Sequence, residues 1–87
     1  MKYEVTSNGE TVWVNGGPFG VSIGRFSWKG IDVHTLDALG CLDCRPGPFT
    51  SDSEAWESFR ESMLTHHGAR VPKKHKPTKW SLKTEAT

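Results

Sequence analysis

The sequence predicts an α+β domain in which a four-stranded antiparallel meander, residues 2–35, packs against one helix, residues 52–67. Three observations indicate this fold class. Short apolar–polar alternations separated by turn signals come first, and a helical repeat of apolar residues follows. The length of 87 residues, with 34% apolar side chains, suits one small core. We expect one domain over residues 1–69 and an extended basic tail over residues 70–87.

The first two strands are predicted around a tight turn. Asn8-Gly9 stands between two alternating segments, and Asn-Gly in this position is the strongest short-range hairpin signal. In the second segment Val12 and Val14 share one face, which places Trp13 on the other.

A second pair of strands follows. In its first strand Phe19, Val21 and Ile23 alternate with Gly20, Ser22 and Gly24, and we expect this strand to continue through Arg25-Phe26.

In that second pair, Trp28-Lys29-Gly30 is predicted to form the connecting turn. Ile31 and Val33 then alternate with Asp32 and His34, so one face is apolar and the other holds an acid and an imidazole. Residues 36–50 show no periodicity, and their prolines and glycines predict a loop.

The helix has clear boundaries. Ser51 and Glu54 form a capping box at its start, and Gly68 is a natural cap after its end. The apolar positions at helical spacing are expected to pack on the sheet: Ala55, Trp56, Phe59, Met63 and Leu64.

Charge is sorted along the chain. Residues 1–68 contain nine acidic and five basic side chains, whereas residues 69–87 contain six basic side chains and one acid. Such separated charge steers encounters with other macromolecules and does little for the fold. The sequence contains no complete catalytic signature, so we expect a binding protein rather than an enzyme.

The compartment predicted is the cytoplasm. Met1-Lys2-Tyr3-Glu4 lacks the apolar stretch of a signal peptide, and no segment reaches the length of a membrane span. In that compartment we expect Cys41 and Cys44 as thiols or metal ligands rather than as a disulfide.

Cys41 and Cys44 have the spacing at which two thiolates chelate one tetrahedral ion. His34 and either His66 or His67 are the candidates for the remaining zinc ligands. Two alternatives stay open: a redox dithiol, and reduced cysteines that only help to pack a loop.

A catalytic alternative uses the polar strand face. Asp32 is able to orient the imidazole of His34, with Cys41 or Ser22 as the nucleophile. Strand alternation alone also places such a pair on the wet side of a sheet. A deep cleft in which Asp32, His34 and a thiol converge would favour an enzyme over a binding protein.

The tail supports a nucleic-acid alternative. Its cations would neutralise phosphates and its aromatic ring would stack on a base. The candidate residues are Arg70, Lys73, Lys74, Lys76, Lys79 and Trp80. The competing interpretation is that the tail folds against the protein's own acidic helix.

Two groups of residues are candidates for contacts with a protein partner. Trp and Arg are enriched at binding hot spots, and a row of carboxylates competes for a partner's cationic groove. The candidates are Trp13, Arg25 and Trp28 on the sheet, and Glu54, Glu57 and Glu61 on the helix. The alternatives are that helix and tail bury the rings, and that the acids are a solvated helix face.

Four motifs resemble a group of small hypothetical proteins encoded by phages and prophages. They are Val12-Trp13-Val14-Asn15-Gly16, Ser22-Ile23-Gly24-Arg25-Phe26, Gly30-Ile31-Asp32-Val33-His34 and Cys41-Leu42-Asp43-Cys44. The similarity extends into the helix, with Trp56 and Phe59. It continues after the helix, with Val71-Pro72 and Lys74-His75-Lys76-Pro77. The resemblance assigns no activity. Where the group has Cys-x-x-Cys-Thr-His-Gly, this chain has Arg45-Pro46-Gly47 after Cys44, so one possible zinc ligand is missing.

The resemblance implies a phage accessory protein that binds a host protein stoichiometrically, for example as an inhibitor of a defence nuclease or a nucleic-acid enzyme. The alternative function is a small nucleic-acid-binding protein with a Cys/His zinc site.

Overall fold

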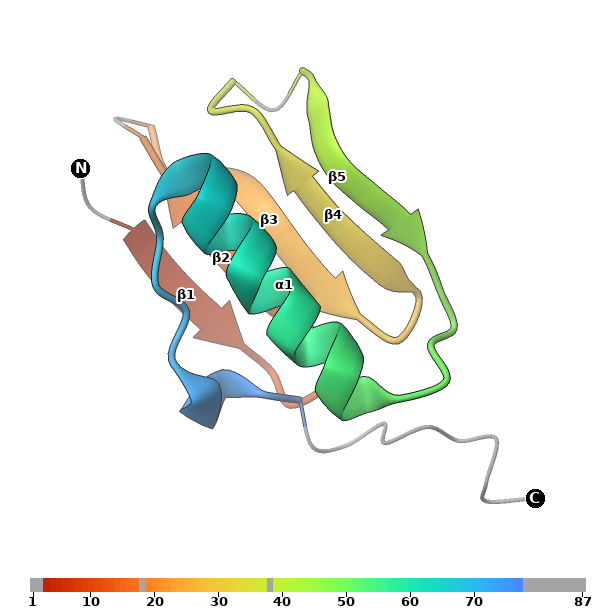
Figure 1. Ribbon diagram of the computed structural model, residues 1–87. Coiled ribbons are helices and arrows are strands. Elements are labelled where there is room, and N and C mark those ends of the chain that lie inside the picture. Colours follow the sequence, from red (N-terminus) through yellow and green to blue (C-terminus); the bar gives the residue numbers. More distant parts are fainter. Residues whose placement is uncertain (1–2, 18, 38, 78–87) are drawn as a thin grey trace.

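A computed structural model describes residues 3–17, 19–37 and 39–77 of the chain. It consists of one antiparallel sheet with a single long helix against one face (Figure 1). The strands lie in the sheet in chain order: β1 (Tyr3–Ser7), β2 (Val12–Gly16), β3 (Val21–Ser27), β4 (Gly30–His34) and β5 (Cys41–Pro46). They are followed by α1 (Asp52–His67) and the short 3-10 helix η1 (Lys73–His75). The predicted α+β class and meander order are confirmed.

The sheet has five strands rather than the four predicted, because residues 41–46 of the predicted loop form β5. This strand pairs with β4 from Gly30 opposite Pro46 to His34 opposite Cys41. The register shifts along the pair, which leaves Leu42 as an extra residue and breaks the period-2 pattern that sequence analysis relies on. Pro46 is tolerated because it stands at the end of an edge strand.

The predicted turns are confirmed. The side-chain Oδ1 of Asn8 accepts hydrogen bonds from the backbone N–H groups of Glu10 and Thr11, each at 2.8 Å, and closes the β1–β2 hairpin. Trp28 and Lys29 form the turn between β3 and β4.

The core lies between one sheet face and α1, as predicted. Leu64 does not belong to it, because this side chain is 45% exposed in an open hollow beside the segment that follows α1. Phe26 of β3 is at the centre of the core, with ring centroids 5.2 Å from Trp56 and 5.5 Å from Phe59. The helix approaches β3 closely at Gly24, where a Cβ atom would lie 2.5 Å from the sulfur of Met63. The fully buried apolar side chains come from β2, β3, β4, α1 and the segment after it.

Both ends of α1 are capped by the residues that the sequence predicts. Ser51 Oγ accepts a hydrogen bond from the N–H of Glu54 at 3.2 Å. Gly68 adopts a left-handed conformation with φ 66°, and its N–H donates to the carbonyl of Leu64. These caps explain why the predicted helix bounds are correct.

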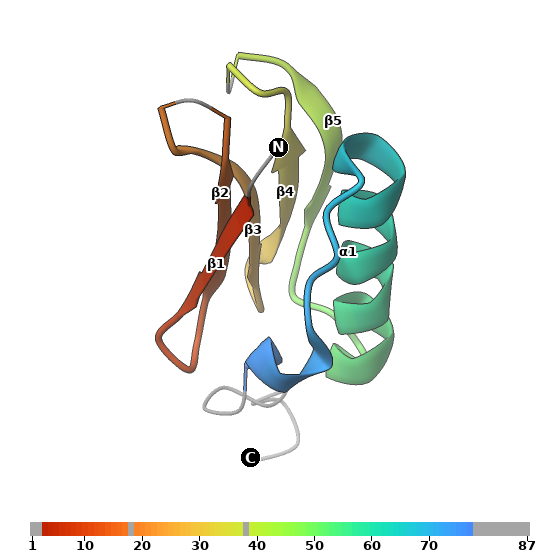
Figure 2. The same ribbon diagram turned by 90° about the vertical axis from the view of Figure 1, so that its left-hand side faces the viewer.

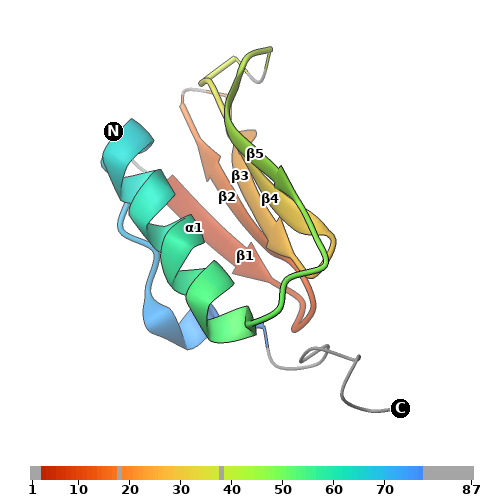
Figure 3. The ribbon, with the colours of Figure 1, turned by 45° about the vertical axis from the view of Figure 1, so that its right-hand side comes forward.

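The chain after α1 turns back along the helix beside β1 (Figure 3). Ala69, Val71 and Pro77 are buried there. Arg60 Nε donates to the carbonyl of Val71 at 2.6 Å, and Lys76 Nζ lies 2.9 Å from Ser53 Oγ and 3.5 Å from Asp52. For Lys76, therefore, the interpretation that the tail contacts the protein's own acidic helix is confirmed.

The face of the sheet opposite α1 has no element over it among the described residues (Figure 2). Among the residues that the structure describes, no helix has the length and the apolar content needed to cross a bilayer. The uncovered side, which we call the open face, is where the candidate functional residues of the strands lie.

Candidate functional site

The open face is crossed by one continuous row of cross-strand neighbours. The register pairs Thr6 with Trp13, Trp13 with Arg25, Arg25 with Asp32, and Asp32 with Cys44. These residues alternate with the buried valines, isoleucines and Phe26 of the same strands, so they point away from α1. The sequence-predicted Trp13, Arg25 and Asp32 thus become direct neighbours.

An ion pair lies at the centre of this row. Arg25 Nη2 lies 2.5 Å and Nε 3.1 Å from the same carboxylate oxygen, Oδ2 of Asp32. The side chain of Arg25 is 55% exposed and that of Asp32 is 26% exposed. The pair neutralises the charge at the middle of the face and holds the guanidinium beside Trp13.

Trp13, Arg25 and Trp28 line one open hollow of about 300 Å³, which we call the tryptophan corner. The indole of Trp28 is 41% exposed, although it is one of the largest apolar groups in the chain. The rest of the lining is polar and carries both signs of charge: Glu10, Thr11, Ser27 and Lys29. An exposed ring beside a cation is typical of a binding hot spot.

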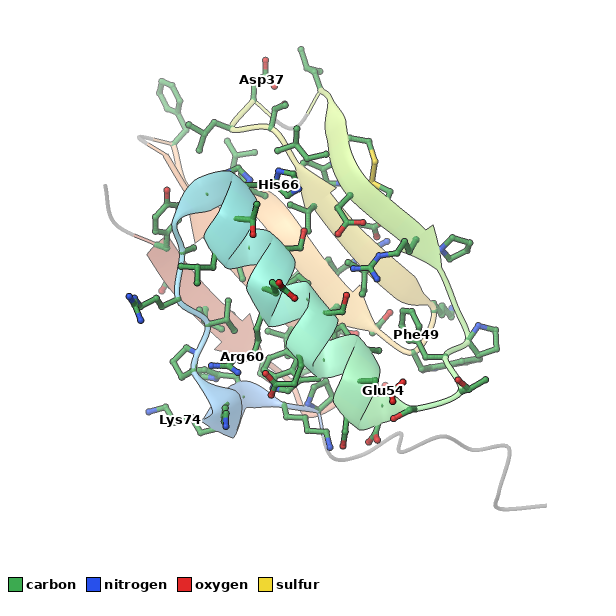
Figure 4. The ribbon with its side chains drawn as sticks, in the orientation of Figure 1. Asp37, Phe49, Glu54, Arg60, His66 and Lys74 are labelled. Carbon is green, nitrogen blue, oxygen red and sulfur yellow. A yellow bond between two sulfur atoms is a disulfide. The ribbon has the colours of Figure 1, made fainter. Side chains whose placement is uncertain are left out.

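The three acidic candidates lie elsewhere. Glu54, Glu57 and Glu61 are exposed on the outer side of α1, across the sheet from the tryptophan corner, and Figure 4 shows Glu54 near the helix start. Glu57 pairs with Arg60 at 2.7 Å. The six residues predicted to contact a partner therefore belong to two opposite faces of the molecule.

Cys41 and Cys44 form a disulfide, so the expectation of free thiols or metal ligands is wrong for this state. In a regular strand, residues three apart point to opposite faces. The extra residue Leu42 in β5 brings the two Cα atoms to 6.1 Å and both side chains to the open face, within the range that a disulfide spans.

A group of potential metal ligands adjoins the disulfide. One ligand atom each from Asp32, His34 and Cys44 lie within 4.8 Å of one another. His66, proposed as a ligand from the sequence, lies on α1 across the sheet, where its charge acts on Asp43 (Figure 4). His67 instead donates from Nε2 to the backbone carbonyl of His34 at 2.7 Å and fixes the helix end to β4.

The same group meets part of the criterion for an enzyme. Asp32 and His34 do converge with a cysteine, but its sulfur is in a disulfide and is not a thiol. Ser22 lines the same hollow of about 500 Å³, together with Trp13 and Arg25, and this hollow is open to solvent. The geometry therefore brings these residues together in a hollow open to solvent, with the sulfur of Cys44 held in the disulfide.

The covered side of β5 carries a charged group, Asp43, whose environment differs from that of the open face. Burial raises the pKa of Asp43, but the nearby Ser62 hydroxyl, the guanidinium of Arg45 and the charge of His66 more than offset it, so this pKa lies below its ordinary value. Arg45 Nε donates to Asp43 at 2.9 Å. Ser62 Oγ is buried and has no hydrogen-bond partner of its own among the described residues, so it acts on Asp43 as a nearby dipole.

Asp37, in the β4–β5 loop, is exposed and has a different environment. The hydroxyl of Thr35 and the N–H of Leu39 donate to its carboxylate, and these hydrogen bonds lower its pKa. They order a loop that Figure 4 places at the far end of the sheet from Glu54.

Sequence analysis missed two exposed apolar side chains at this loop end of the sheet. Phe19 is 89% exposed and Leu39 is 88% exposed. Phe19 lies in a turn rather than in the predicted strand, because the N–H of Gly20 donates to the carbonyl of Gly17 and β3 begins only at Val21. The turn-forming residues Gly17, Pro18 and Gly20 around it are the signal that would have found this.

The cationic tail candidates divide in a similar way. Arg70, Lys73 and Lys74 are exposed, whereas Lys76 is held by Asp52 and Ser53. Lys79 and Trp80 lie outside the described residues.

Comparison of the chain with protein-family models, with curated proteins and with solved structures finds no match.

Proposed function

We propose that this chain is a non-enzymatic binding protein that uses the open face, anchored at the tryptophan corner, to bind a protein partner stoichiometrically. The single observation on which the proposal rests is the exposed Trp28, placed with Trp13 and Arg25 on a sheet face that no described element covers. Six of the eight large aromatic rings in the described part of the chain are buried or half-buried, and Phe19 and Trp28 are the exceptions. Of these two, Trp28 lies beside a second ring and a cation, so its exposure needs a reason.

The charge of this surface favours a protein over a nucleic acid. Nucleic-acid binding depends on unpaired cations that neutralise phosphates. On the open face Arg25 is paired with Asp32, and Lys29 shares its hollow with Glu10. A protein partner that offers an apolar pocket for Trp28 and a hydrogen-bond acceptor for Lys29 fits a surface that carries both positive and negative charges.

The resemblance to phage-encoded proteins supports a host protein, such as a defence nuclease or another nucleic-acid enzyme, as the partner. Inhibition by occupancy needs a complementary surface and no reacting group, which suits a chain without a complete catalytic signature.

The test is capture from nuclease-treated host lysate on the immobilised full-length protein, followed by measurement of affinity and stoichiometry with the captured protein. We expect one partner chain per protein. Trp28→Ala should weaken binding by about 30-fold or more, the loss typical of a hot spot.

Glu61→Gln is the control on the other face, because it neutralises an exposed carboxylate on the outer side of α1 and leaves the tryptophan corner unchanged. It should leave the affinity unchanged. Binding that disappears on nuclease treatment would assign the function to nucleic acid. Binding that is lost with Glu61→Gln and kept with Trp28→Ala would move the recognition surface to the helix.

A further inference from the structure

We propose that reduction of the Cys41–Cys44 disulfide opens a site for one thiophilic divalent cation, such as zinc, with Cys41, Cys44, His34 and Asp32 as its ligands. The site belongs to the β4–β5 part of the open face, and it does not depend on the identity of any protein partner.

The register of the two strands places the four side chains as two facing pairs. His34 is opposite Cys41, and Asp32 is opposite Cys44. The extra residue Leu42 keeps both cysteines on the face that Asp32 and His34 share. Without that irregularity one cysteine would point toward α1, and no common site would exist.

The separations suit a tetrahedral ion. The ligand atoms of Asp32, His34 and Cys44 are mutually within 4.8 Å, and the sulfur of Cys41 is bonded to that of Cys44. With zinc–sulfur bonds of about 2.3 Å and zinc–nitrogen bonds of about 2.0 Å, neighbouring ligand atoms around zinc are roughly 3.3–3.8 Å apart. Rotation of these half-exposed and exposed side chains spans the remaining distance of about 1 Å.

Two of the ligands are available without breaking other structure. His67 contacts the backbone carbonyl of His34 and not its ring. Within the described part of the chain the imidazole of His34 makes no hydrogen bond, so it is available to a metal ion. Both bonds from Arg25 end on Oδ2 of Asp32, which leaves Oδ1 outside the ion pair. Arg25 is nevertheless a cation beside the site, and it opposes metal binding.

The disulfide determines whether the site exists. Two small-molecule thiols supply two electrons and two protons, the S–S bond breaks into two thiols, and the reductant leaves as its own disulfide. Both cysteines are exposed, so a soluble thiol reaches them. The cation then displaces the thiol protons, which return to solvent, and binds the two thiolates. In the oxidised state the sulfurs are unavailable as thiolates.

This ligand set differs from the one expected from sequence, because Asp32 replaces His66. His66 belongs to α1 and acts on Asp43, on the covered side of β5, whereas Cys44 is on the open face. The sheet itself separates them.

The test is a cobalt titration of the full-length protein, once oxidised and once reduced by a phosphine and desalted without oxygen. We expect one equivalent of cobalt in the reduced protein, with sulfur-to-cobalt charge-transfer absorption that zinc abolishes, and no such band in the oxidised protein. Cobalt binding in the oxidised protein, or none in the reduced protein, would overturn the proposal.

Variants test the ligand set. His34→Asn and Asp32→Asn should each weaken cobalt binding by about 10-fold or more. Loss of a residue that only hydrogen-bonds to a metal ligand already lowers metal affinity about 10- to 100-fold, and loss of a ligand itself should cost no less. His66→Asn should bind like the wild type, and Arg25→Gln should bind more tightly because a competing cation is gone.

A reduced chain that had unfolded would bind cobalt through its two thiols alone, and the His34 and Asp32 variants would then match the wild type. That result, or a loss with His66→Asn equal to the loss with His34→Asn, would refute the assignment. Far-ultraviolet circular dichroism of each reduced variant shows whether weaker cobalt binding comes from unfolding or from the loss of a ligand in a folded chain.

Discussion

The two faces of the sheet are formed by alternate residues of the same strands, and they differ in almost every physical property. On the covered face the central strands present fully buried apolar side chains to α1. On the open face the same strands carry the half-buried Trp13 and the Arg25–Asp32 ion pair, with the exposed Trp28 in the adjoining turn and the disulfide on the neighbouring β5. Stability and recognition are therefore assigned to opposite sides of one layer, and substitutions on each side should act on different measurements.

The largest effect should come from the covered face. Phe59 is fully buried against Phe26 and Trp56, and its ring lies over Gly24, where a Cβ atom would be 3.5 Å from it. Phe59→Ala should lower the free energy of unfolding by about 3–5 kcal/mol, since it removes buried apolar area and leaves a cavity. Urea unfolding followed by tryptophan fluorescence measures this loss, which approaches the whole stability of a small domain.

Trp28→Ala is the control for that substitution on the open face. It removes an even larger ring, but one that is 41% exposed, and should change the free energy of unfolding by about 0.5 kcal/mol or less. Equal losses for the two substitutions would contradict the division between a stabilising and a recognising face.

A smaller effect is expected at the edge of the open face. The Cys41–Cys44 bridge closes a very short loop. By lowering the entropy of the unfolded chain, a bridge of this loop length stabilises the folded state by about 2 kcal/mol. Replacing both cysteines by serine should lower the melting temperature by roughly 8–16 °C and leave the fold intact.

Calorimetry of the double serine variant, beside the reduced and oxidised wild type, checks this expectation. The reduced wild type should melt close to the variant when metal is absent. A variant that fails to fold would show that the disulfide, rather than the core, stabilises the domain.

Much of the fold could be predicted from the sequence because its signals are local. Asn8-Gly9 sets a hairpin, Ser51 and Gly68 cap a helix, and valines at alternate positions mark a buried face. β5 was not predictable in this way. Its side chains are mostly exposed on both faces, and the extra residue Leu42 shifts its alternation by one position.

The site was only partly predictable for the same physical reason. Trp13 and Asp32 could be placed opposite the apolar face by strand period alone. Arg25 could not, because counting by two from Ile23 puts it on the apolar face; it joins the open face since the register shift between β2 and β3 leaves Ile23 as an extra residue. The disulfide and the contact of Cys44 with Asp32 and His34 depend on how β5 pairs with β4. No local pattern contains that information.

The smallest predicted effect concerns the acid limit of stability on the covered side of β5. Burial alone raises the pKa of Asp43, yet Ser62, Arg45 and His66 together bring it below the ordinary value of 3.8. A carboxyl whose pKa is lower in the folded state adds stability that is fully present above the unfolded pKa. That stability is lost as the pH falls through the folded pKa.

Asp43→Asn should therefore be less stable than the wild type at neutral pH, and the difference should shrink as the pH is lowered below about 4. Arg45→Gln should weaken the same pH dependence without abolishing it, because Ser62 and His66 stay in place. Urea unfolding of the wild type and both variants, at neutral pH and at several acidic values, measures the slope. A difference between Asp43→Asn and the wild type that grows toward acid would mean that burial dominates at Asp43. In that case the carboxylate destabilises the covered face, and its ion pair with Arg45 only reduces that cost.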